Sequence, residues 1–563
     1  MKTKIIKLEI KGMTCDGCVN HVTKALSSVD GVSEVKINGW KSAKAEVLLN
    51  KEIDTEKLIE AVKTSGYDAE VQKGFIENQL SGKSSANSDY DLIIVGGGSA
   101  AFAAAIKASE LDKKVLMIND GLPIGGTCVN VGCVPSKTLI RAAEQFHIAN
   151  HPHFTGIKPG NNKIDFKEVI RQKNELVEEL RQHKYVDVLK DDSNPEGTSV
   201  TFLSARAKLV DKNKVEANGK IYSAEKLLLA TGATTFVPDI PALLAPSGKN
   251  ISYLTNDILY ELEKLPEHLI VIGGRYVALE NSQMFARLGS KVTILQRSNR
   301  ILPNEMPDIS ESLKEYLEQE GIGIKTGVKI KSIENKNGRV WVNASVKETD
   351  ETIEGTHLFV ATGRTGNTNK LGLENLGIGL HKQSFIRTNE YMQTTVPNIY
   401  AAGDITGEYL FVYSAAYEGA LAVQNMFTDN PAKKDYSVFP WVIFTDPQVA
   451  GVGMDENQAY EANIDYQVST VQLKDVPRSL AARNTKGFIK LVRNKETDKL
   501  IGARILASEG SELLMEISLA IKYGITVKEL KQMFHPYLTL SEGIKIAAIS
   551  FDKDVKKLSC CAV

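Results

Sequence analysis

The first 72 residues carry a hydrophobic pattern of their own. Apolar and polar positions alternate from Lys4 to Ile10, as in a half-buried strand, and the stretch from Cys18 to Val29 has helical spacing. A second helical pattern runs through Leu58 and Val62, and short strand patterns lie at residues 35–37, 45–49 and 67–71. The order β-α-β-β-α-β predicts a ferredoxin-like domain over residues 1–72. Residues 73–89 are rich in Ser, Asn and Gly and are expected to form a flexible linker.

The pattern changes at Tyr90, where apolar runs lead into glycines and then into helices. The run Asp91–Val95 precedes Gly96, Gly97, Gly98 and an Ala-rich helix, and Leu269–Ile272 precedes Gly273, Gly274 and a helix through Ala286. Two such units predict two Rossmann-like nucleotide-binding domains in an α/β chain. No nucleotide fingerprint follows residue 438, so the last part is expected to be an α/β domain with another task.

The amino-acid composition excludes some classes of function. The 563 residues suggest three or four domains, and 68 Lys plus Arg against 69 Asp plus Glu give a net charge of −1. That balance lacks the basic field of a general nucleic-acid binder. No apolar run reaches the roughly 18 residues of a membrane helix, and charges interrupt the start MKTKIIKLEIK, so no secretory signal is predicted. We therefore expect a cytoplasmic protein without stable membrane insertion or a nucleic-acid partner.

The six cysteines form three close pairs. They are Cys15 with Cys18, Cys128 with Cys133, and Cys560 with Cys561. In a chain without a secretory signal, short-spaced pairs favour metal binding or redox chemistry over structural disulfides. Each pair keeps an alternative interpretation: a redox pair at Cys15 and Cys18, a zinc half-site or two buried cysteines in the middle, and two unpaired thiols at the end.

The first nucleotide fingerprint is Gly96-x-Gly98-x-x-Ala101, which follows a strand and opens a helix. Its glycines let the backbone approach a pyrophosphate at the helix N-terminus. The acid expected after the second strand is replaced by Asn119, with Asp120 next to it. An Asn can still hydrogen-bond a ribose, so we expect a dinucleotide site here; the alternative is a tight turn without a ligand.

The second fingerprint departs further from the pattern. Arg275 stands where the middle glycine is expected, and it can either crowd the pyrophosphate or bond to it. After the second strand of this unit come Gln296, Arg297 and, further on, Arg300, with no acid for a ribose. Two arginines can bind a 2′-phosphate, so NADPH is predicted rather than NADH. The alternative is that these arginines are merely solvated.

The most specific stretch is Gly125–Lys137, GGTCVNVGCVPSK. Its two cysteines are five residues apart, within disulfide reach across a helical turn, and at a helix start both thiols are expected to have lowered pKa values. With this stretch, residues 90–563 resemble the flavoprotein disulfide reductases. The resemblance implies an FAD-binding domain at 90–237 and 358–437, an NADPH-binding domain at 238–357 and a dimerisation domain at 438–563.

The resemblance also implies roles for individual residues. Cys128 would exchange with the substrate and Cys133 would contact the flavin, with Lys137 paired to Glu280 beside it, while Tyr276 would cover the flavin before nicotinamide binds. The remaining cofactor-binding positions are in the family's motifs: Gly126 and Thr127, the turns Ala230-Thr231-Gly232 and Ala361-Thr362-Gly363 between the nucleotide domains, and Asp404 of Ala402-Gly403-Asp404, which would meet the FAD.

Both ends of the chain carry thiols suited to soft metal ions. Gly12-Met13-Thr14-Cys15-Asp16-Gly17-Cys18 offers two thiolates in an open loop, and residues 1–72 resemble heavy-metal-associated domains. Tethered by the linker, such a domain would hold an ion near the catalytic unit. The ending Ser559-Cys560-Cys561-Ala562 resembles that of the mercury-reducing members of the flavoprotein family, in which the tail of one subunit delivers Hg(II) to the redox pair of the other.

A last comparison concerns the proton-handling group. Disulfide reductases of the family place a His–Pro five residues before a glutamate, whereas here Tyr537 lies five before Glu542 and His535-Pro536 lies seven before. A phenol with a pKa near 10 is a poor proton shuttle, and reducing a metal ion forms no dithiol product. The alternative is that a loop adjustment still brings His535 to the site.

The resemblance thus implies a homodimer that uses FAD and NADPH to reduce Hg(II), brought as thiolate complexes, to elemental mercury. Cys128, Cys133, Cys560 and Cys561 would carry the ion, and Tyr537 and the tail would come from the partner subunit. Two other functions remain open. One is a general disulfide reductase of thioredoxin or lipoyl type with an added metal domain, and the other is a soft-metal carrier on a vestigial flavoprotein.

Overall fold

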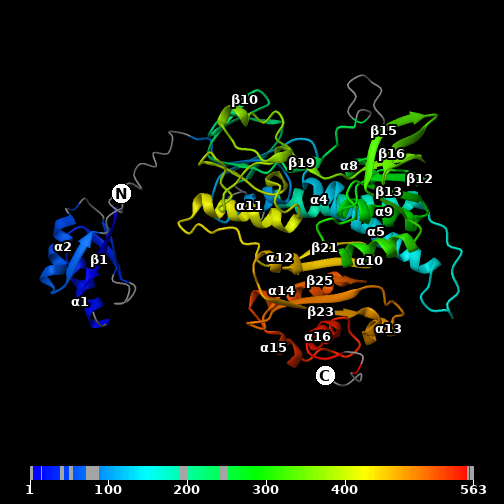
Figure 1. Ribbon diagram of the computed structural model, residues 1–563. Coiled ribbons are helices and arrows are strands. Elements are labelled where there is room, and N and C mark those ends of the chain that lie inside the picture. Colours follow the sequence, from blue (N-terminus) through cyan, green and yellow to red (C-terminus); the bar gives the residue numbers. More distant parts are fainter. Residues whose placement is uncertain are drawn as a thin grey trace. The chain divides into compact units, whose positions relative to one another are not determined.

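The computed structural model describes residues 4–13, 16–37, 44–49, 53, 55–71, 88–189, 200–240, 243, 252–554 and 557. It divides into two compact units, Met1–Ser88 and Asp89–Val563 (Figure 1). The linker expected at residues 73–89 lies almost entirely outside the described residues.

The first unit is a ferredoxin-like domain, which confirms the expected βαββαβ order. Its elements are β1 (Lys4–Lys11), α1 (Asp16–Ser27), β2 (Val32–Ile37), β3 (Lys44–Leu49), α2 (Thr55–Thr64) and β4 (Asp68–Val71). The sheet order is β2-β3-β1-β4 with every pairing antiparallel. Leu8 and Ile10 of the sheet pack against Val22, Leu26 and Leu58 of the helices. Strand β2 starts three residues earlier than the apolar pattern indicated, because Val32 already pairs with Leu49.

The second unit begins with a sheet of mixed pairing. Strands β5 (Tyr90–Val95), β6 (Val115–Asn119) and β7 (Val200–Ser204) run parallel to β10 (Lys220–Leu229) and β20 (Ile399–Ala401), and β8 (Ala207–Asp211) and β9 (Lys214–Ala217) extend it antiparallel. Helices α3 (Ser99–Ser109) and α11 (Val412–Phe427) pack closely: a Cβ on Gly419 would lie 2.1 Å from Ala100 O. Residues from both ends of the segment 90–437 therefore build one domain.

Helices α4 (Gly126–Val131), α5 (Cys133–Asn150), α6 (Phe166–Arg181), the π-helix η2 (Gln182–Val186) and α7 (Asp187–Leu189) lie between β6 and β7 in the chain. The two-stranded ribbon of β11 (Ala233–Thr235) and β19 (Arg364–Gly366) lies next to the points where the chain leaves and re-enters this domain. The short helices α8 (Asn256–Leu259), η3 (Glu374–Leu376), η4 (Lys382–Ser384) and η5 (Asp404–Thr406) complete the connections.

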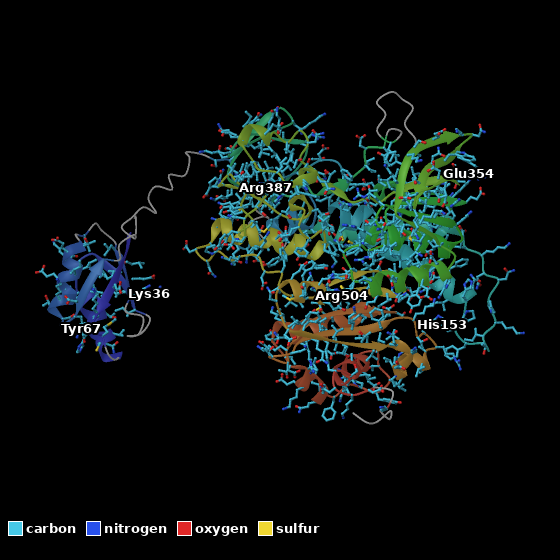
Figure 2. All side chains as sticks on the ribbon, viewed as in Figure 1. Lys36, Tyr67, His153, Glu354, Arg387 and Arg504 are labelled. Carbon is cyan, nitrogen blue, oxygen red and sulfur yellow. The ribbon has the colours of Figure 1, made fainter. Side chains whose placement is uncertain are left out.

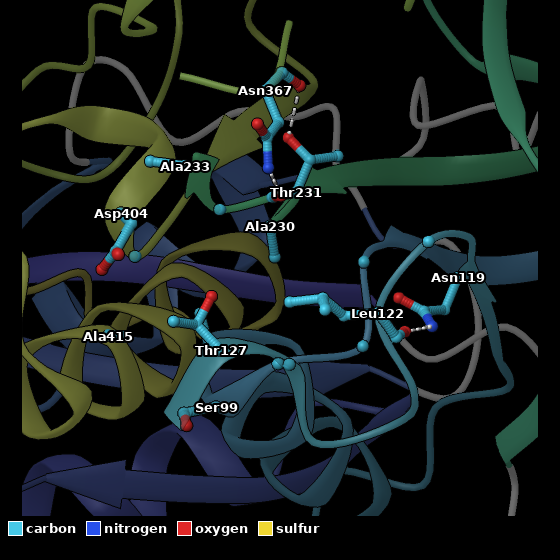
Figure 3. Close-up of a pocket in the computed structure, with 18 of the residues that line it drawn as sticks. Ser99, Asn119, Leu122, Thr127, Ala230, Thr231, Ala233, Asn367, Asp404 and Ala415 are labelled. Carbon is cyan, nitrogen blue, oxygen red and sulfur yellow. Dashed lines mark hydrogen bonds between the residues drawn. The ribbon is translucent and has the colours of Figure 1, made fainter. Parts of the chain in front are cut away.

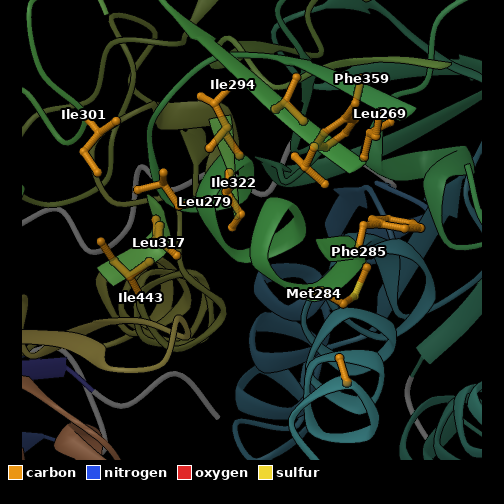
Figure 4. Close-up of a cluster of buried hydrophobic side chains, with 14 of the residues drawn as sticks. Leu269, Leu279, Met284, Phe285, Ile294, Ile301, Leu317, Ile322, Phe359 and Ile443 are labelled. Atoms are coloured by element: carbon orange, nitrogen blue, oxygen red, sulfur yellow. The ribbon is translucent and has the colours of Figure 1, made fainter. Parts of the chain in front are cut away.

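The second nucleotide-binding domain is built on a parallel sheet of order β14-β13-β12-β18. Its elements are β12 (His268–Ile272), α9 (Tyr276–Leu288), β13 (Lys291–Gln296), α10 (Pro307–Gln319), β14 (Gly323–Thr326) and β18 (His357–Val360), with the antiparallel sheet β15 (Val328–Lys336), β16 (Arg339–Val346) and β17 (Thr349–Gly355). Leu269, Leu279, Phe285, Ile294 and Phe359 form the core between sheet and helices (Figure 4). All five residues of β12 are buried, as a short, continuous apolar run predicts.

The C-terminal domain has an antiparallel sheet of order β21-β22-β25-β24-β23. Its elements are β21 (Trp441–Ile443), β22 (Gln448–Gly453), α12 (Glu456–Glu461), β23 (Tyr466–Gln472), η6 (Leu473–Asp475), α13 (Pro477–Ala481), β24 (Phe488–Asn494), β25 (Leu500–Ala507), η7 (Gly510–Leu513), α14 (Leu514–Lys522), α15 (Val527–Gln532) and α16 (Glu542–Ile549). Arg504, labelled in Figure 2, is buried and donates to Glu305 Oε2 of the preceding domain at 3.2 Å. A buried ion pair thus joins the two domains.

Across the described ranges, no helix combines the length and the apolar character needed to cross a membrane.

Candidate active site

A cavity of about 480 Å³ opens where the first nucleotide-binding fold meets α4 and α5. That volume lies within the range of about 300–1,000 Å³ found for small-molecule and cofactor sites. Figure 3 shows Asp404 and Thr127 on one side of it and Asn119 across from them. Of the residues singled out by the sequence, its lining includes Gly96, Gly98, Asn119, Asp120, Gly126, Thr127, Cys128, Cys133, Thr231, Gly232 and Asp404.

The first glycine of each fingerprint closes the same kind of turn. Gly96 has φ 132° and Gly273 φ 127°, values that favour glycine. A Cβ would lie 2.1 Å from Ala230 O at Gly96 and 2.3 Å from Ala361 O at Gly273. Each glycine therefore packs against the Ala-Thr-Gly turn of its own domain, with Gly232 in one case and Gly363 in the other. The two nucleotide sites are therefore built on the same kind of glycine turn, one in each domain.

The first cavity fits a dinucleotide. A Cβ on Gly126 would lie 2.7 Å from Gly98 Cα, so the start of α4 touches the start of α3 and both leave bare backbone facing the cavity. The α3 N-terminus can thus receive phosphate charge. Ala101 is buried inside α3. Asn119 donates its amide to Leu122 O at 3.0 Å (Figure 3), while Asp120 forms an ion pair with Arg206 at 3.6 Å.

Asp404 and Thr231 complete the far wall of the cavity. Burial raises the pKa of Asp404, and Arg364 at 3.7 Å opposes that rise. The Thr231 hydroxyl donates to Asn367 O, and the Asn367 amide donates back to Thr231 O, both at 2.9 Å (Figure 3). This half-buried acid lines the cavity and can accept hydrogen bonds from ligand hydroxyl groups, so the polar lining matches the polar part of FAD.

Two cysteines line the cavity from consecutive helices. Cys128 is in α4, Cys133 begins α5, and Gly132 lies between the helices, where a Cβ would be 2.8 Å from Thr127 O. The Cys128 thiol donates a hydrogen bond to Cys133, which lowers the pKa of Cys133 to about 7; burial opposes this effect and the Lys137 charge adds to it.

The same hydrogen bond, with burial, raises the pKa of Cys128. The expectation that both thiols have lowered pKa values is therefore wrong for Cys128. The physical reason is that two adjacent sulfurs share one proton, and the helix N-terminus and Lys137 favour the charge on Cys133.

An ion pair lies one helical turn beyond Cys133. Lys137 Nζ donates to Glu280 Oε2 at 2.7 Å, and Glu280 Oε1 accepts from the Phe444 amide at 2.9 Å. The Lys137 ammonium also lies 4.7 Å from the centre of the Phe444 ring. Lys137, Glu280 and Phe444 thus join both nucleotide-binding domains and the C-terminal domain next to the cysteine pair.

Aromatic rings flank the cavity near Tyr276, the first residue of α9. Its ring stacks on Trp441 with 5.8 Å between centres and lies 6.3 Å from Phe411, which lines the cavity. Burial raises the pKa of Tyr276, so its phenol stays neutral. Tyr276 therefore sits at the border between the two nucleotide-binding domains.

Sequence reasoning missed Tyr185, which lies on the π-helix η2. Its ring meets Phe102 edge-on at 4.9 Å, and a Cβ on Gly125 would lie 3.1 Å from it. Burial raises its pKa, a hydrogen bond with Ser99 opposes that, and the charges of Cys128 and Cys133 add to the rise. A second phenol thus lies within electrostatic reach of the cysteines. Only the π-helix signals it, and π-helices are frequent at functional sites but leave no sequence motif.

The arginines of the second fold differ in their surroundings. Arg297 is exposed directly after β13, whereas Arg300 donates to Pro303 O and Glu305 O, both at 3.1 Å, and so holds its own loop. Arg275 is exposed at the N-cap of α9, with a long contact of 3.4 Å to Asn304. The second site thus gathers positive charge around a helix N-terminus, which fits the phosphates of a nicotinamide dinucleotide.

The remaining predicted site residues are described only in part. Cys15, Cys560 and Cys561 lie outside the described residues, and Cys18 is half-buried in the first unit. Tyr537 is 55% exposed and is not among the residues that line the cavity. His535 Nε2 contacts Glu516 Oε1 at 2.6 Å. Within the described ranges, no group of three or more His, Cys, Asp or Glu residues could hold a metal ion.

Two nucleotide-binding folds next to a pair of cysteines are typical of the pyridine nucleotide-disulphide oxidoreductases. The model of that class matches residues 90–419, its dimerisation domain matches residues 439–548, and a heavy-metal-associated domain matches residues 7–68.

Similar proteins narrow the class. The chain is 40% identical to a mercuric reductase of Staphylococcus aureus and 41% identical to one of Lysinibacillus sphaericus, in both cases over 99% of each chain. The chain belongs to the mercuric reductase family. Among solved structures, it resembles the HOCl-induced flavoprotein disulfide reductase RclA from Escherichia coli, with a TM-score of 0.72, 27% identity and coverage of 82% of this chain and 99% of that one.

Proposed function

We propose that this chain uses NADPH and FAD to reduce Hg(II) to elemental mercury. One observation carries the proposal: a hydrogen-bonded thiol–thiolate pair lines a dinucleotide-sized cavity in a chain that matches mercuric reductases over 99% of its length. Soft thiolates are the ligands that Hg(II) prefers.

Thr127, Asp404 and the N-terminus of α3 would hold FAD in the cavity, where it would supply the hydride and electron chemistry that links NADPH to the Cys128–Cys133 pair. The residues of the chain then set the outcome. Cys133 carries the negative charge near neutral pH and Cys128 keeps the proton, so the pair is ready to exchange ligands. Lys137, held by Glu280, keeps positive charge beside the thiolate. Tyr276 covers the flavin face until the nicotinamide arrives, and Arg297 binds the 2′-phosphate of NADPH.

Hg(II) arrives bound to Cys560 and Cys561 and moves by ligand exchange. Each new bond from mercury to Cys128 or Cys133 replaces one bond to the tail, and the Cys128 proton passes to the released tail thiolate. Two electrons from a second NADPH reduce Hg(II) to Hg(0), and both sulfurs keep their own bonding electrons. The neutral atom has lost its affinity for thiolates and leaves.

The active site is shared between two subunits in this proposal, with Tyr537 and the tail donated across the interface. The match of residues 439–548 to a dimerisation domain supports the homodimer. An apolar surface of the C-terminal domain supports it as well, because Met515, Leu519, Tyr523, Met533 and Phe534 are all exposed, Phe534 fully.

We assign a metal-binding domain to residues 1–72, a linker to 73–89, an FAD domain to 90–237 with 361–437, an NADPH domain to 238–360 and a dimerisation domain to 438–563. The boundary expected between residues 357 and 358 moves to 360, because all of β18 pairs with β12 of the NADPH domain. Cys15 and Cys18 would capture the metal ion, and the protein would act in the cytoplasm.

A general disulfide reductase is the second candidate, because the similar solved structure is described as a flavoprotein disulfide reductase. The test offers purified protein NADPH with Hg(II) and excess small thiol, and in parallel oxidised glutathione, thioredoxin or lipoamide. Hg(II)-dependent NADPH oxidation with mercury vapour in the headspace, abolished by Cys128→Ala, supports the proposal. Fast disulfide turnover without vapour, unchanged when Cys560 and Cys561 are both replaced by Ala, refutes it in favour of the disulfide reductase.

A further inference from the structure

Glu418 of α11 is an acidic side chain enclosed in the FAD-binding domain. It has no solvent exposure. Both of its carboxylate oxygens are engaged: Oε2 accepts from the Gly403 amide at 2.7 Å, and Oε1 accepts from the Tyr436 hydroxyl at 2.5 Å. Burying a carboxylate is costly unless hydrogen bonds compensate, so this arrangement requires a reason beyond packing.

The amide that Glu418 holds belongs to the turn that forms one wall of the flavin cavity. Gly403 has φ 79° and is the N-cap of η5, and both Gly403 and Asp404 line the cavity. The Gly403 carbonyl accepts from the Thr406 amide at 2.9 Å and from the Thr406 hydroxyl at 3.0 Å. Glu418 therefore fixes the N–H of a residue whose C=O is already held by Thr406, so both peptide units that flank Gly403 are fixed.

The other partner of Glu418 lies on the segment that leaves the domain. Tyr436 is between α11 and β21, and its ring packs edge-on against Phe439 at 5.8 Å and lies 4.4 Å from Tyr409. The charged neighbours of Glu418 are Glu408 and Lys434, which form an ion pair with each other. Glu418 thus bridges the turn before Asp404 and the connection to the C-terminal domain.

We infer that Glu418 is a positioning residue for FAD: it holds the Gly403–Asp404 turn in the conformation that presents Asp404 to the cofactor, with Tyr436 as its anchor. Glu418 itself does not line the cavity. Its effect on the cofactor is therefore indirect, through the orientation of Asp404. This inference rests on the proposed function, since it assumes that FAD occupies the cavity.

The test measures FAD binding to the full chain after the flavin has been removed, by titration and by flavin absorbance, together with the thermal melting of the flavin-free protein. Removing the carboxyl group leaves the Gly403 amide and the Tyr436 hydroxyl buried without their acceptor. Glu418→Leu is therefore expected to raise the FAD dissociation constant at least tenfold. Glu418→Gln, whose amide oxygen can still accept from Gly403, should recover most of the affinity.

A second pair of variants keeps the test decisive if Glu418→Leu does not fold. Tyr436→Phe removes only the anchoring hydroxyl and should weaken FAD binding several-fold. Tyr417→Phe is the matched control, because the Tyr417 hydroxyl accepts from the Asp435 amide in the same aromatic cluster without contacting Glu418. It should leave FAD affinity unchanged.

The outcomes separate the two claims. Wild-type protein that takes up no FAD refutes the proposed function. Wild-type protein that binds FAD while Glu418→Leu and Tyr436→Phe bind it equally well refutes the positioning role. Equal losses of affinity in Glu418→Gln and Glu418→Leu, matched by equal losses of thermal stability without flavin, also refute it, because the residue would then act on folding alone.

Discussion

Replacing Lys137 with Met should raise the pKa of Cys133, because the ammonium group favours the thiolate. Lys137 lies one helical turn after Cys133 in α5, where Cβ atoms are about 6 Å apart, and we take this value for the separation of the two charges. At an effective dielectric constant of about 20, their attraction is roughly 3 kcal/mol, or about two pKa units. The Lys137 side chain keeps 34% of its exposure, and solvent screening reduces the expected change to about one unit.

The pKa of Cys133 is about 7 in the wild-type protein and should therefore be about 8 in Lys137→Met. Since Cys133 reacts as the thiolate, its alkylation rate at fixed pH below 7 should fall nearly tenfold. The assay reduces the protein, labels it with iodoacetamide at a series of pH values and assigns the label to Cys133 by peptide fragmentation.

Two further variants test the electrostatic reasoning. Glu280 raises the pKa of Cys133, so the double variant Lys137→Met with Glu280→Gln should bring that pKa back towards 7. Arg141→Met removes a cation from the same helix whose partners are Glu144 and Glu509, and it should change nothing at Cys133. If Lys137→Met alkylates with the wild-type pH profile, the pKa of Cys133 is set by Cys128 alone and the reasoning fails.

Three other changes have definite expected results. Gly96→Ala should destabilise the fold by about 1–3 kcal/mol or more, because its Cβ would lie 2.1 Å from Ala230 O. At Gly98 the nearest atom to an added Cβ is 3.7 Å away, so Gly98→Ala should melt like wild type yet bind less flavin. Similar melting temperatures of the two variants would contradict this. Arg297→Gln should raise the KM for NADPH about tenfold and leave that for NADH unchanged; steady-state kinetics with both nucleotides decide, and equal effects would exclude a 2′-phosphate role. Arg287→Met should cost about 3–5 kcal/mol at neutral pH, because it leaves Glu320 buried without its cation. Burial raises the pKa of Glu320, but Arg287 outweighs this effect, so the net shift of the pKa is downward from 4.5. The ion pair therefore stabilises the folded state above pH 4.5, and the difference in unfolding free energy between variant and wild type should shrink as the pH falls below that value. Denaturant unfolding at a series of pH values measures it, and a constant difference would refute the assignment.

The fold was predictable where local pattern and tertiary structure agree. The buried run of β12 and the alternation of β1 reappear as strands, because each pattern leaves one arrangement that hides its apolar side chains. The glycines of both fingerprints were equally informative, since each meets a carbonyl oxygen that excludes a Cβ. The limits of strands were less predictable: β2 begins at Val32 because β3 offers a partner there, which is a property of the pair and not of the segment.

The sequence motifs predicted which residues form the candidate site, but they did not predict the protonation and the contacts of those residues. The sequence places Cys128 and Cys133 together, but the uneven sharing of their proton depends on which sulfur begins a helix and faces Lys137. Arg297 and Arg300 look equivalent in the sequence, yet one is exposed and the other is occupied by loop carbonyls. Tyr185 and Glu418 carry no motif, because their positions come from long-range packing.

The π-helix at Gln182–Val186 makes the place of Tyr185 depend on the number of residues as well as on their identity. A π-turn holds one residue more than an α-turn, and each residue of an α-helix turns the chain by about 100°. Deleting one codon among residues 182–184 would let α6 continue as an ordinary helix, and Tyr185 would rotate away from Phe102 with its side chain unaltered. A single-residue insertion or deletion in this segment would therefore move Tyr185 relative to Phe102 without changing any side chain of the pair.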